Sequence, residues 1–278
     1  MAAGSPGNIM AFDLHAYFER IGYGGPARAD EATLRAVHEA QAAAIPFENI
    51  DVLLGRQLDL SPEGIARKLV TAKRGGYCYE QNLLLLAALR AIGFEVTALA
   101  ARVRMSYGGP RPRTHALLRV KAGGADWIAD TGFGLSGLLE PVPLRAGAEV
   151  SLPLVSFRVV DEDGLFLMQA RKDGGDWENL YVFSLEPQQE VDFVMANHFT
   201  ATWPRSPFIR SLIVGRVTRD RRLMLVDRDF SETTAAGTAR REIGAAEELF
   251  SAIERDFGLA VDDPAIAERA FAEKESWG

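Results

Sequence analysis

Cys78 is the only cysteine in this chain of 278 residues, and it stands where a glycine loop, 74–76, gives way to a strongly helical segment. A thiol in the first turn of a helix faces unpaired backbone N–H groups and the positive end of the helix dipole, and both favour the thiolate. Lys73 and Arg74 add positive charge just upstream. Because a free cysteine is more commonly a small buried hydrophobe, its interpretation as a nucleophile depends on its partners.

Two candidate partners, His115 and Asp130, fall on one predicted hairpin. Residues 115–120 alternate and are rich in strand formers, the Ala-Gly-Gly-Ala run at 122–125 is a turn signal, and an apolar strand resumes at Trp127. Counting outward from this turn places residue 115 opposite a residue between 130 and 132, within reach of a cross-strand neighbour. Either residue alone has a simpler structural explanation. Together they predict a triad in which the imidazole takes the thiol proton and the carboxylate orients the imidazole.

At these residues the chain resembles the arylamine N-acetyltransferases. The matching runs, in chain order, are Arg-Gly-Gly-Tyr-Cys-Tyr-Glu-Gln-Asn at 74–82, Thr-His-x-Leu-Leu-x-Val at 114–120 and Asp-x-Gly-Phe-Gly at 130–134. Further matches lie at Ile-Pro-Phe-Glu-Asn, 45–49, and from Asn197 through the Trp-Pro-Arg-Ser-Pro-Phe run that ends at Phe208. The chain departs mildly from the family at Thr131, where a branched apolar residue is frequent, and at Tyr79, where phenylalanine is common.

The resemblance implies an α+β fold in three parts. These are an N-terminal helical bundle, 1–94, that carries the nucleophile, a central antiparallel β-barrel, 95–200, that carries the histidine and aspartate, and a C-terminal α/β lid, 201–278. Their core would be a Cys-His-Asp centre like that of transglutaminases and papain. The implied activity is transfer of an acetyl group from acetyl-CoA, the co-substrate, to an arylamine, arylhydroxylamine or hydrazine. The reaction would be ping-pong, through an acetyl-cysteine intermediate.

The motifs also supply candidate binding residues. Phe47, Phe133 and Phe208 are expected to line the acceptor pocket, because a flat aromatic ring needs apolar walls. Core packing is the alternative for each of them. Thr114 and Gly134, which belong to the motifs around the triad histidine and aspartate, are candidate contacts of coenzyme A.

Two basic runs, 102–104 and 111–113, flank a glycine pair just before the triad histidine. The chain lacks a Gly-rich loop of the Walker type, so these arginines are the local candidates for the phosphates of the coenzyme. A solvated hairpin rim explains them equally well. His15, His38 and His198 lie outside the triad motifs and are interpreted as structural, because their spacing is not that of metal ligands, and no metal is expected.

The triad alone leaves other functions open. A thiol hydrolase or a transglutaminase-like enzyme uses the same Cys-His-Asp order, whereas the motifs at 45–49 and 130–134 favour transfer to an amine. An amide synthase that takes another acyl group is closely similar in sequence. A non-enzymatic binding module would make the triad a coincidence.

Composition narrows the class of protein. With 47% hydrophobic residues the chain can bury a full core, and its net charge of −7 and pI near 5.3 argue against nucleic-acid binding, which needs a basic face. A single cysteine excludes an intrachain disulfide and fits a reducing compartment. No signal peptide is visible and no apolar run reaches the roughly 18 residues that span a bilayer. We therefore expect a cytoplasmic protein without membrane contact, with a homo-oligomer left open.

Periodicity and turn signals predict the elements that carry these residues. The first part reads as helices, the middle as strands, and the last part as two strands followed by helices. Predicted helices cover 14–21, 30–43, 61–71, 80–92, 245–257 and 264–274. Predicted strands cover 95–104, 115–121, 126–130, 155–160, 165–170, 179–183, 209–218 and 222–227.

Overall fold

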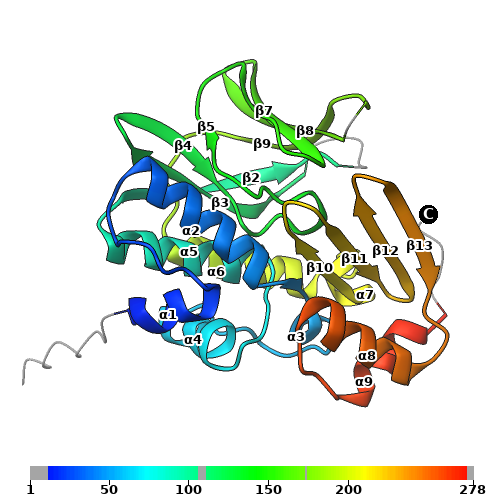
Figure 1. Cartoon of the computed structure of the whole chain (residues 1–278). Coiled ribbons are helices and arrows are strands. Elements are labelled where there is room, and N and C mark those ends of the chain that lie inside the picture. Colours follow the sequence, from blue (N-terminus) through cyan, green and yellow to red (C-terminus); the bar gives the residue numbers. More distant parts are fainter. Residues whose placement is uncertain (1–11, 106–110, 173, 274–278) are drawn as a thin grey trace, which may run out of the picture.

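The computed structural model describes residues 12–105, 111–172 and 174–273. Its helices are α1 (Leu14–Ile21), α2 (Glu31–Ala44), α3 (Ile50–Leu53), α4 (Pro62–Ala66), α5 (Cys78–Ile92), α6 (Glu190–Thr202), α7 (Pro207–Arg210), α8 (Ala246–Phe257) and α9 (Pro264–Phe271), with a π-helical turn, Arg67–Thr71, and a 3₁₀ turn, Gly134–Ser136. Its strands are β1 (Phe47–Glu48), β2 (Glu95–Val103), β3 (Arg113–Ala122), β4 (Ala125–Ala129), β5 (Val142–Pro143), β6 (Ala148–Val150), β7 (Val155–Glu162), β8 (Leu165–Lys172), β9 (Glu178–Phe183), β10 (Ile213–Val217), β11 (Arg222–Val226), β12 (Asp229–Thr234) and β13 (Gly237–Glu242). Figure 1 shows the arrangement, with α1 and α9 at opposite ends.

The N-terminal helices begin and end at the residues that local chemistry favours. Asp30 accepts a hydrogen bond from the Thr33 backbone N–H at 2.8 Å and so starts α2, as predicted. Ser61 caps α4 in the same way and is followed by a proline at the first helical position. Gly93, with φ of 105°, ends α5 in the left-handed conformation, which a residue with a Cβ adopts only under strain.

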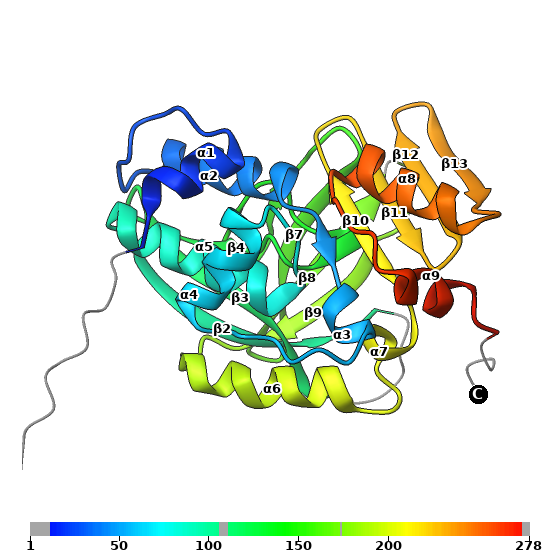
Figure 2. The ribbon, with the colours of Figure 1, turned by 90° about the horizontal axis from the view of Figure 1, so that it is seen from below.

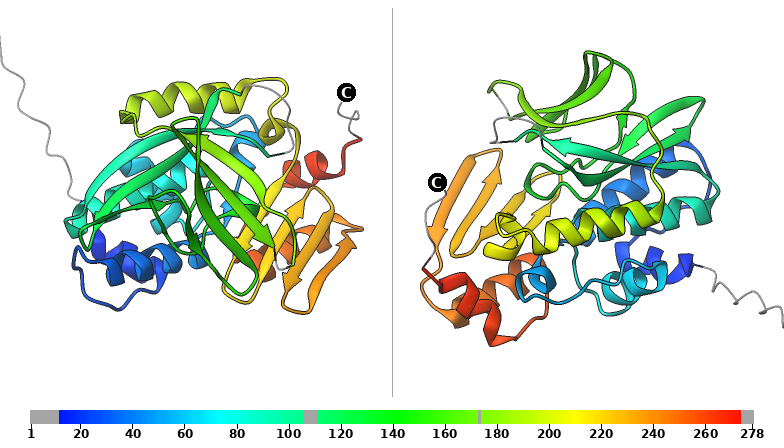
Figure 3. Two further views of the ribbon diagram at one scale, coloured as in Figure 1. Left: turned by 90° about the horizontal axis from the view of Figure 1, so that it is seen from above. Right: turned by 180° about the vertical axis from the view of Figure 1, so that it is seen from behind.

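The central part of the chain forms one antiparallel sheet of eight strands that curls into a nearly closed barrel. The strand order is β5-β4-β3-β2-β9-β8-β7-β6. The two edge strands, β5 and β6, therefore follow each other directly in the sequence. Figure 3 shows the curled sheet from above and the helix α6 lying across it from behind. The β3–β4 hairpin turns at Gly123 and Gly124, whose φ values of 59° and 76° fit a two-residue turn that matches the strand twist.

The strands of this hairpin are buried on both faces. Ala116, Leu118 and Val120 of β3 belong to the core shared with the helical bundle, where α5 packs on the sheet, whereas Leu117 belongs to the core inside the barrel. The apolar run of α5 is buried in the first of these cores, as predicted. The helix that begins at Cys78 is thus held against the strand that carries His115.

A second antiparallel sheet has the order β1-β10-β11-β12-β13, and α8 and α9 cover it. Its edge strand β1 comes from the N-terminal part of the chain and pairs Phe47 with Gly215. The segment 45–49 is therefore tied to the last third of the chain.

Several stretches differ from the prediction, among them the short elements β1, α3, β5 and β6, which were not predicted. The helix α6 runs along β2 and β3 in the view from below (Figure 2) and was not predicted, because its apolar residues do not gather on one face. Residues 207–210 are helical, since Ser206 caps a turn that starts with Pro207, and the predicted strand begins only at Ile213. Strands β12 and β13 are polar and have no apolar alternation to reveal them.

Candidate active site

Cys78 is the first residue of α5, which begins two residues earlier than the predicted helix 80–92, and it is 5% exposed. The turn before it is held by Glu80, whose Oε2 accepts the Tyr77 backbone N–H at 3.1 Å. The Cys78 Sγ lies 3.8 Å from the carbonyl oxygen of Thr114, the residue before His115. The thiol thus sits where the helix meets β3.

His115 and Asp130 are hydrogen-bonded, as the hairpin register predicted. The Asp130 Oδ2 lies 2.7 Å from the His115 Nε2, and both side chains are buried. Asp130 lies one residue beyond the end of β4, so it meets the imidazole diagonally across the hairpin. Its Oδ1 accepts the Asn82 side-chain amide at 2.9 Å and the Gly132 backbone N–H at 3.0 Å.

These contacts hold the pair in its charged form. Burial alone disfavours the ionised carboxylate, but the positive charge and hydrogen bond of His115, followed by the Asn82 and Gly132 bonds, lower the pKa of Asp130 below its usual range. Burial likewise opposes a charged His115, yet Asp130, together with a hydrogen bond to Cys78, raises the pKa of His115 to about 10. Since Nε2 faces the carboxylate, Nδ1 is the nitrogen left for the thiol. The geometry suits proton transfer from thiol to imidazole.

Asn82 was part of a matched motif, but nothing in the sequence pointed to its role. Besides its bond to Asp130, it donates to the Ala116 carbonyl at 2.6 Å and accepts the Thr131 backbone N–H at 3.0 Å. It lies four residues after Cys78, so it faces the same side of α5. Asn82 therefore joins the helix of the thiol to the chain of the carboxylate.

A buried ion cluster supports the loop that precedes Cys78. Arg74 donates to the Glu48 Oε1 at 2.7 Å, and Lys68 lies 2.7 Å from the Glu80 Oε1 and 2.8 Å from the Asp51 Oδ2. Burial raises the pKa of Glu80 to about 7 even though Lys68 favours its charged form. Lys73 and Arg74 were expected to favour the thiolate of Cys78. Arg74 instead forms an ion pair with Glu48, so its charge is partly neutralised there.

Of the three predicted pocket residues, Phe133 contacts His115, whereas Phe47 and Phe208 contact each other. Phe133 meets the His115 ring edge-on at a centroid distance of 4.8 Å, and the rings of Phe47 and Phe208 lie 6.1 Å apart. Gly134 packs against the Phe47 ring, since a Cβ at this position would lie 3.4 Å from it. Phe47 and Phe208 belong to the core shared with the helical bundle, whereas Phe133 packs against the core inside the barrel.

The two departures from the family pattern both use their hydroxyl groups. Thr131 accepts the Gln41 side-chain amide at 2.8 Å, and Tyr79 donates to the Thr114 carbonyl at 2.9 Å. Since the Thr114 carbonyl also faces the Cys78 thiol, the Tyr79 hydroxyl binds the backbone beside the nucleophile.

The arginine runs are largely paired within the protein. Arg104 lies 2.7 Å from Glu162, and Arg113 lies 2.6 Å from Glu186. Arg102 donates to the backbone carbonyl of residue 111. The glycine pair at 108–109 lies outside the described residues. In the described ranges, no group of three or more His, Cys, Asp or Glu side chains is placed to hold a metal ion, and no helix is long and apolar enough to cross a membrane.

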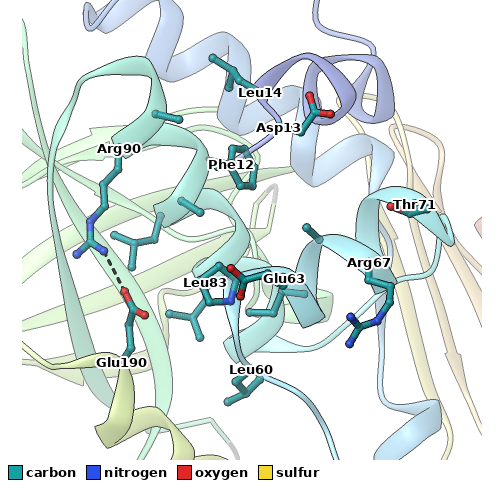
Figure 4. Close-up of a pocket in the computed structure, with 16 residues that line it drawn as sticks. Phe12, Asp13, Leu14, Leu60, Glu63, Arg67, Thr71, Leu83, Arg90 and Glu190 are labelled. Atoms are coloured by element: carbon teal, nitrogen blue, oxygen red, sulfur yellow. Dashed lines mark hydrogen bonds and ion pairs between the residues drawn. The ribbon is translucent and has the colours of Figure 1, made fainter. Parts of the chain in front are cut away.

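The triad lies outside a groove of about 840 Å³ on the helical bundle. Figure 4 shows Phe12, Leu60 and Leu83 around this groove, with an ion pair between Arg90 of α5 and Glu190 of α6 at 3.0 Å. Its lining is mainly apolar and contains none of the predicted site residues.

Comparison with known proteins identifies the family. A family model described as N-acetyltransferase matches residues 30–266, which is most of the chain. The arylamine N-acetyltransferase of Escherichia coli is 37% identical over 253 residues, covering 90% of both chains. The chain belongs to the arylamine N-acetyltransferase family. A second family member, from Salmonella typhimurium, is described as an arylamine N-acetyltransferase and N-hydroxyarylamine O-acetyltransferase and is 38% identical over 258 residues, 91% of both chains.

The fold agrees with that of solved arylamine N-acetyltransferases. The Mycobacterium marinum enzyme, solved in complex with CoA, superposes with a TM-score of 0.87 at 31% identity, covering 93% of this chain and 98% of the other. The mixed α/β fold expected from the motifs is thereby confirmed.

Proposed function

We propose that this arylamine N-acetyltransferase moves an acetyl group from acetyl-CoA to the nitrogen of an aromatic amine or hydrazine, with arylhydroxylamines as further acceptors, through an acetyl-Cys78 intermediate. The observation that carries the proposal is the buried pair of His115 and Asp130, 2.7 Å apart, beside a thiol at the start of a helix. The family membership and the M. marinum complex with CoA support the donor. The arylamine and arylhydroxylamine acceptors follow the activities named for the E. coli and S. typhimurium relatives, and the hydrazine acceptor follows from the family resemblance alone.

In the first half-reaction, Cys78 loses its proton to His115 Nδ1 and its sulfur attacks the thioester carbonyl of acetyl-CoA. The C–S bond to coenzyme A breaks as the new C–S bond to Cys78 forms, and the imidazolium returns the proton to the departing thiolate. One thioester replaces another, so the step needs an activated thiol rather than a large driving force. Asp130 stabilises the imidazolium and keeps the proton-bearing Nε2 turned toward itself.

In the second half-reaction, the acceptor nitrogen attacks the acetyl-Cys78 carbonyl. An amide bond forms, the C–S bond to Cys78 breaks, and His115 takes the proton of the nitrogen. An aromatic amine is largely unprotonated at neutral pH and can attack directly. Backbone N–H groups in the first turn of α5 are the candidates to stabilise the oxyanion of both tetrahedral intermediates.

We assign the acceptor pocket to Phe47, Phe133 and Phe208. Support comes from the contact of Phe133 with the catalytic imidazole and from the contact between the rings of Phe47 and Phe208. Thr114 and Gly134 are kept as candidate contacts of coenzyme A because they flank the triad residues. We further assign the nucleophile to the helical bundle, 1–94, and the histidine and aspartate to the barrel, 95–200. Residues 201–278 would form a lid over the site. The three catalytic residues would form a centre like that of papain.

Intact-mass spectrometry after mixing the protein with acetyl-CoA tests the proposal. We expect one acetyl adduct on Cys78. This adduct should be lost when an arylamine such as aniline is added, and the acetylated amine should appear as the product. The Cys78→Ser variant should keep its fold and form no adduct, because a serine hydroxyl supplies almost no nucleophilic anion. An unmodified wild-type protein, or acetylation at another residue in both proteins, contradicts the proposal.

A further inference from the structure

His38 lies on α2, outside every matched motif, and is fully buried directly behind the triad. Its Nε2 lies 3.0 Å from the backbone nitrogen of Asp130, and its Nδ1 lies 3.1 Å from the carbonyl oxygen of Leu139. The ring therefore bridges the carboxylate residue of the triad and a loop of the barrel. By contrast, His15 and His198 are exposed on the surfaces of α1 and α6.

The two partners determine the protonation of this ring. A backbone N–H can only donate, so the Nε2 of His38 must carry no proton and accept from Asp130. A carbonyl can only accept, so Nδ1 must carry the proton and donate to Leu139. An imidazolium would place a proton against the Asp130 N–H. The geometry thus requires a neutral ring with its proton on Nδ1, and burial, which lowers the pKa of His38, acts in the same direction.

The charged groups near His38 are compatible with a neutral ring. Asp130 and Glu140 are the carboxylates that face it. Asp130 is already paired with His115, and Glu140 lies 2.9 Å from Arg35 and 2.6 Å from Arg219. Neither carboxylate hydrogen-bonds to the His38 ring, whose two nitrogens are occupied by backbone groups.

The backbone at 130–131 is otherwise held through the next residue. Thr131 donates its N–H to Asn82 of α5 and accepts the side-chain amide of Gln41, which lies on α2 three residues after His38. The backbone N–H of Asp130 has His38 as its hydrogen-bond acceptor. The backbone nitrogen and the carboxylate side chain of Asp130 are attached to the same Cα. A rotation of this peptide would therefore move the carboxylate away from the His115 Nε2.

We propose that His38 is a positioning residue of the triad: as a neutral acceptor it holds the Asp130 main chain, and through it the carboxylate, in line with His115. This inference rests on the triad assignment given under the proposed function. It predicts that any side chain presenting an acceptor to Asp130 and a donor to Leu139 fills the role.

Two substitutions separate positioning from packing. His38→Leu keeps an apolar volume but leaves the Asp130 N–H and the Leu139 carbonyl buried without partners. His38→Gln carries an amide oxygen and an amide NH₂ about as far apart as the two ring nitrogens, so it can replace both bonds. Val37→Ala, a change in a fully buried neighbour without polar atoms, loosens α2 alone and serves as the control.

The readouts are the rate of Cys78 acetylation by acetyl-CoA and the pH profile of its alkylation by iodoacetamide. In His38→Leu we expect acetylation to slow about tenfold or more, the cost of one buried hydrogen bond lost, with the KM for the arylamine unchanged. The alkylation profile should move to higher pH by about half a unit or more, because a misplaced Asp130 no longer supports the imidazolium. His38→Gln should recover most of both, and Val37→Ala should lower thermal stability only.

The proposal fails if His38→Leu retains the wild-type rate and alkylation profile, or if Val37→Ala shifts the profile as much as His38→Leu. Asp130→Asn, measured in parallel, separates this failure from that of the triad assignment: if Asp130→Asn also leaves the profile unchanged, the triad assignment itself is wrong. Should His38→Leu not fold, ¹⁵N spectra of labelled histidine in the wild type decide. They should show His38 neutral with its proton on Nδ1, and an Nε2–H or doubly protonated ring would overturn the proposal.

Discussion

Asn82 donates its side-chain amide to the Asp130 Oδ1 at 2.9 Å, and it stands one helical turn after Cys78. The same side chain accepts the Thr131 backbone N–H and donates to the Ala116 carbonyl. A single buried amide thus links the helix of the nucleophile, the strand after His115 and the chain of the orienting carboxylate. The relative position of thiol and carboxylate depends on this amide more than on any local sequence preference.

Replacing Asn82 by leucine should therefore impair catalysis. The change preserves volume but removes three buried hydrogen bonds, and we expect acetylation of Cys78 to slow by at least about tenfold. Stopped-flow measurement of coenzyme A release gives the rate. Asn179→Leu is the control, because Asn179 is exposed and its side chain accepts a hydrogen bond from the neighbouring Gln169. Equal rates in both variants would show that Asn82 does not align the site.

Asp130→Asn tests the orienting carboxylate. The amide keeps the shape but presents a donor to His115, which favours the wrong tautomer, and in serine-protease triads such a change costs about 10⁴ in kcat. We expect turnover with acetyl-CoA and an arylamine to fall by orders of magnitude.

Asp126→Asn is the matched control for that substitution. Asp126 lies on β4, four residues before Asp130, where it pairs with Lys121 and lies 2.7 Å from Arg119, away from the imidazole. Its loss should change turnover little, since the half-buried ion pair that it forms with Arg119 contacts no residue of the triad. A small effect at Asp130 together with a large one at Asp126 would move the third catalytic role to Asp126.

The His115–Asp130 pair should give stability a specific pH dependence. His115 has a raised pKa, so its contribution is fully present below its ordinary value of 6.5 and is lost as pH rises through about 10. Asp130 has a lowered pKa, so its contribution is present above its ordinary value of 3.8 and is lost as pH falls below it.

The free energy of unfolding of the wild type should therefore exceed that of a His115→Gln, Asp130→Asn double variant most between pH 3.8 and 6.5. Urea unfolding of both proteins across the pH range measures this difference. The difference in free energy of unfolding should decrease as pH rises above 6.5. A difference that grows toward pH 9 is incompatible with a paired imidazolium.

Gly132 is required by close packing. A Cβ at this position would lie 2.7 Å from the Cys78 Cα and 2.8 Å from the Asn82 Nδ2. We expect Gly132→Ala to destabilise the fold by about 1–3 kcal/mol, as overpacking does, and to lower the acetylation rate by displacing Cys78. Gly24→Ala, at a position with open space around it, should do neither. Thermal unfolding and the acetylation assay check both variants, and wild-type behaviour of Gly132→Ala would rule out this contact.

Local sequence was sufficient to predict that His115 and Asp130 meet, and to predict most of the elements that carry them. The first-turn position of Cys78, the hairpin turn at 123–124 and the opposition of His115 and Asp130 follow from capping, turn and pairing rules that act over a few residues. The family resemblance named the same three residues. Elements with weak local signals, such as the polar strand β13, escaped prediction because their stability comes from pairing with a neighbouring strand.

The surroundings of the triad were decided by the tertiary structure alone. Asn82 and His38 reach Asp130 across separations of 48 and 92 residues, and Phe47 meets Phe208 only because β1 pairs with β10. No period or motif encodes such contacts, since a buried donor or acceptor finds its partner only when distant elements pack together. The sequence by itself determined which residues can perform the chemistry. Packing of α2, α5 and the barrel decided which other residues hold them in place, because satisfying buried polar groups is a property of the assembled core.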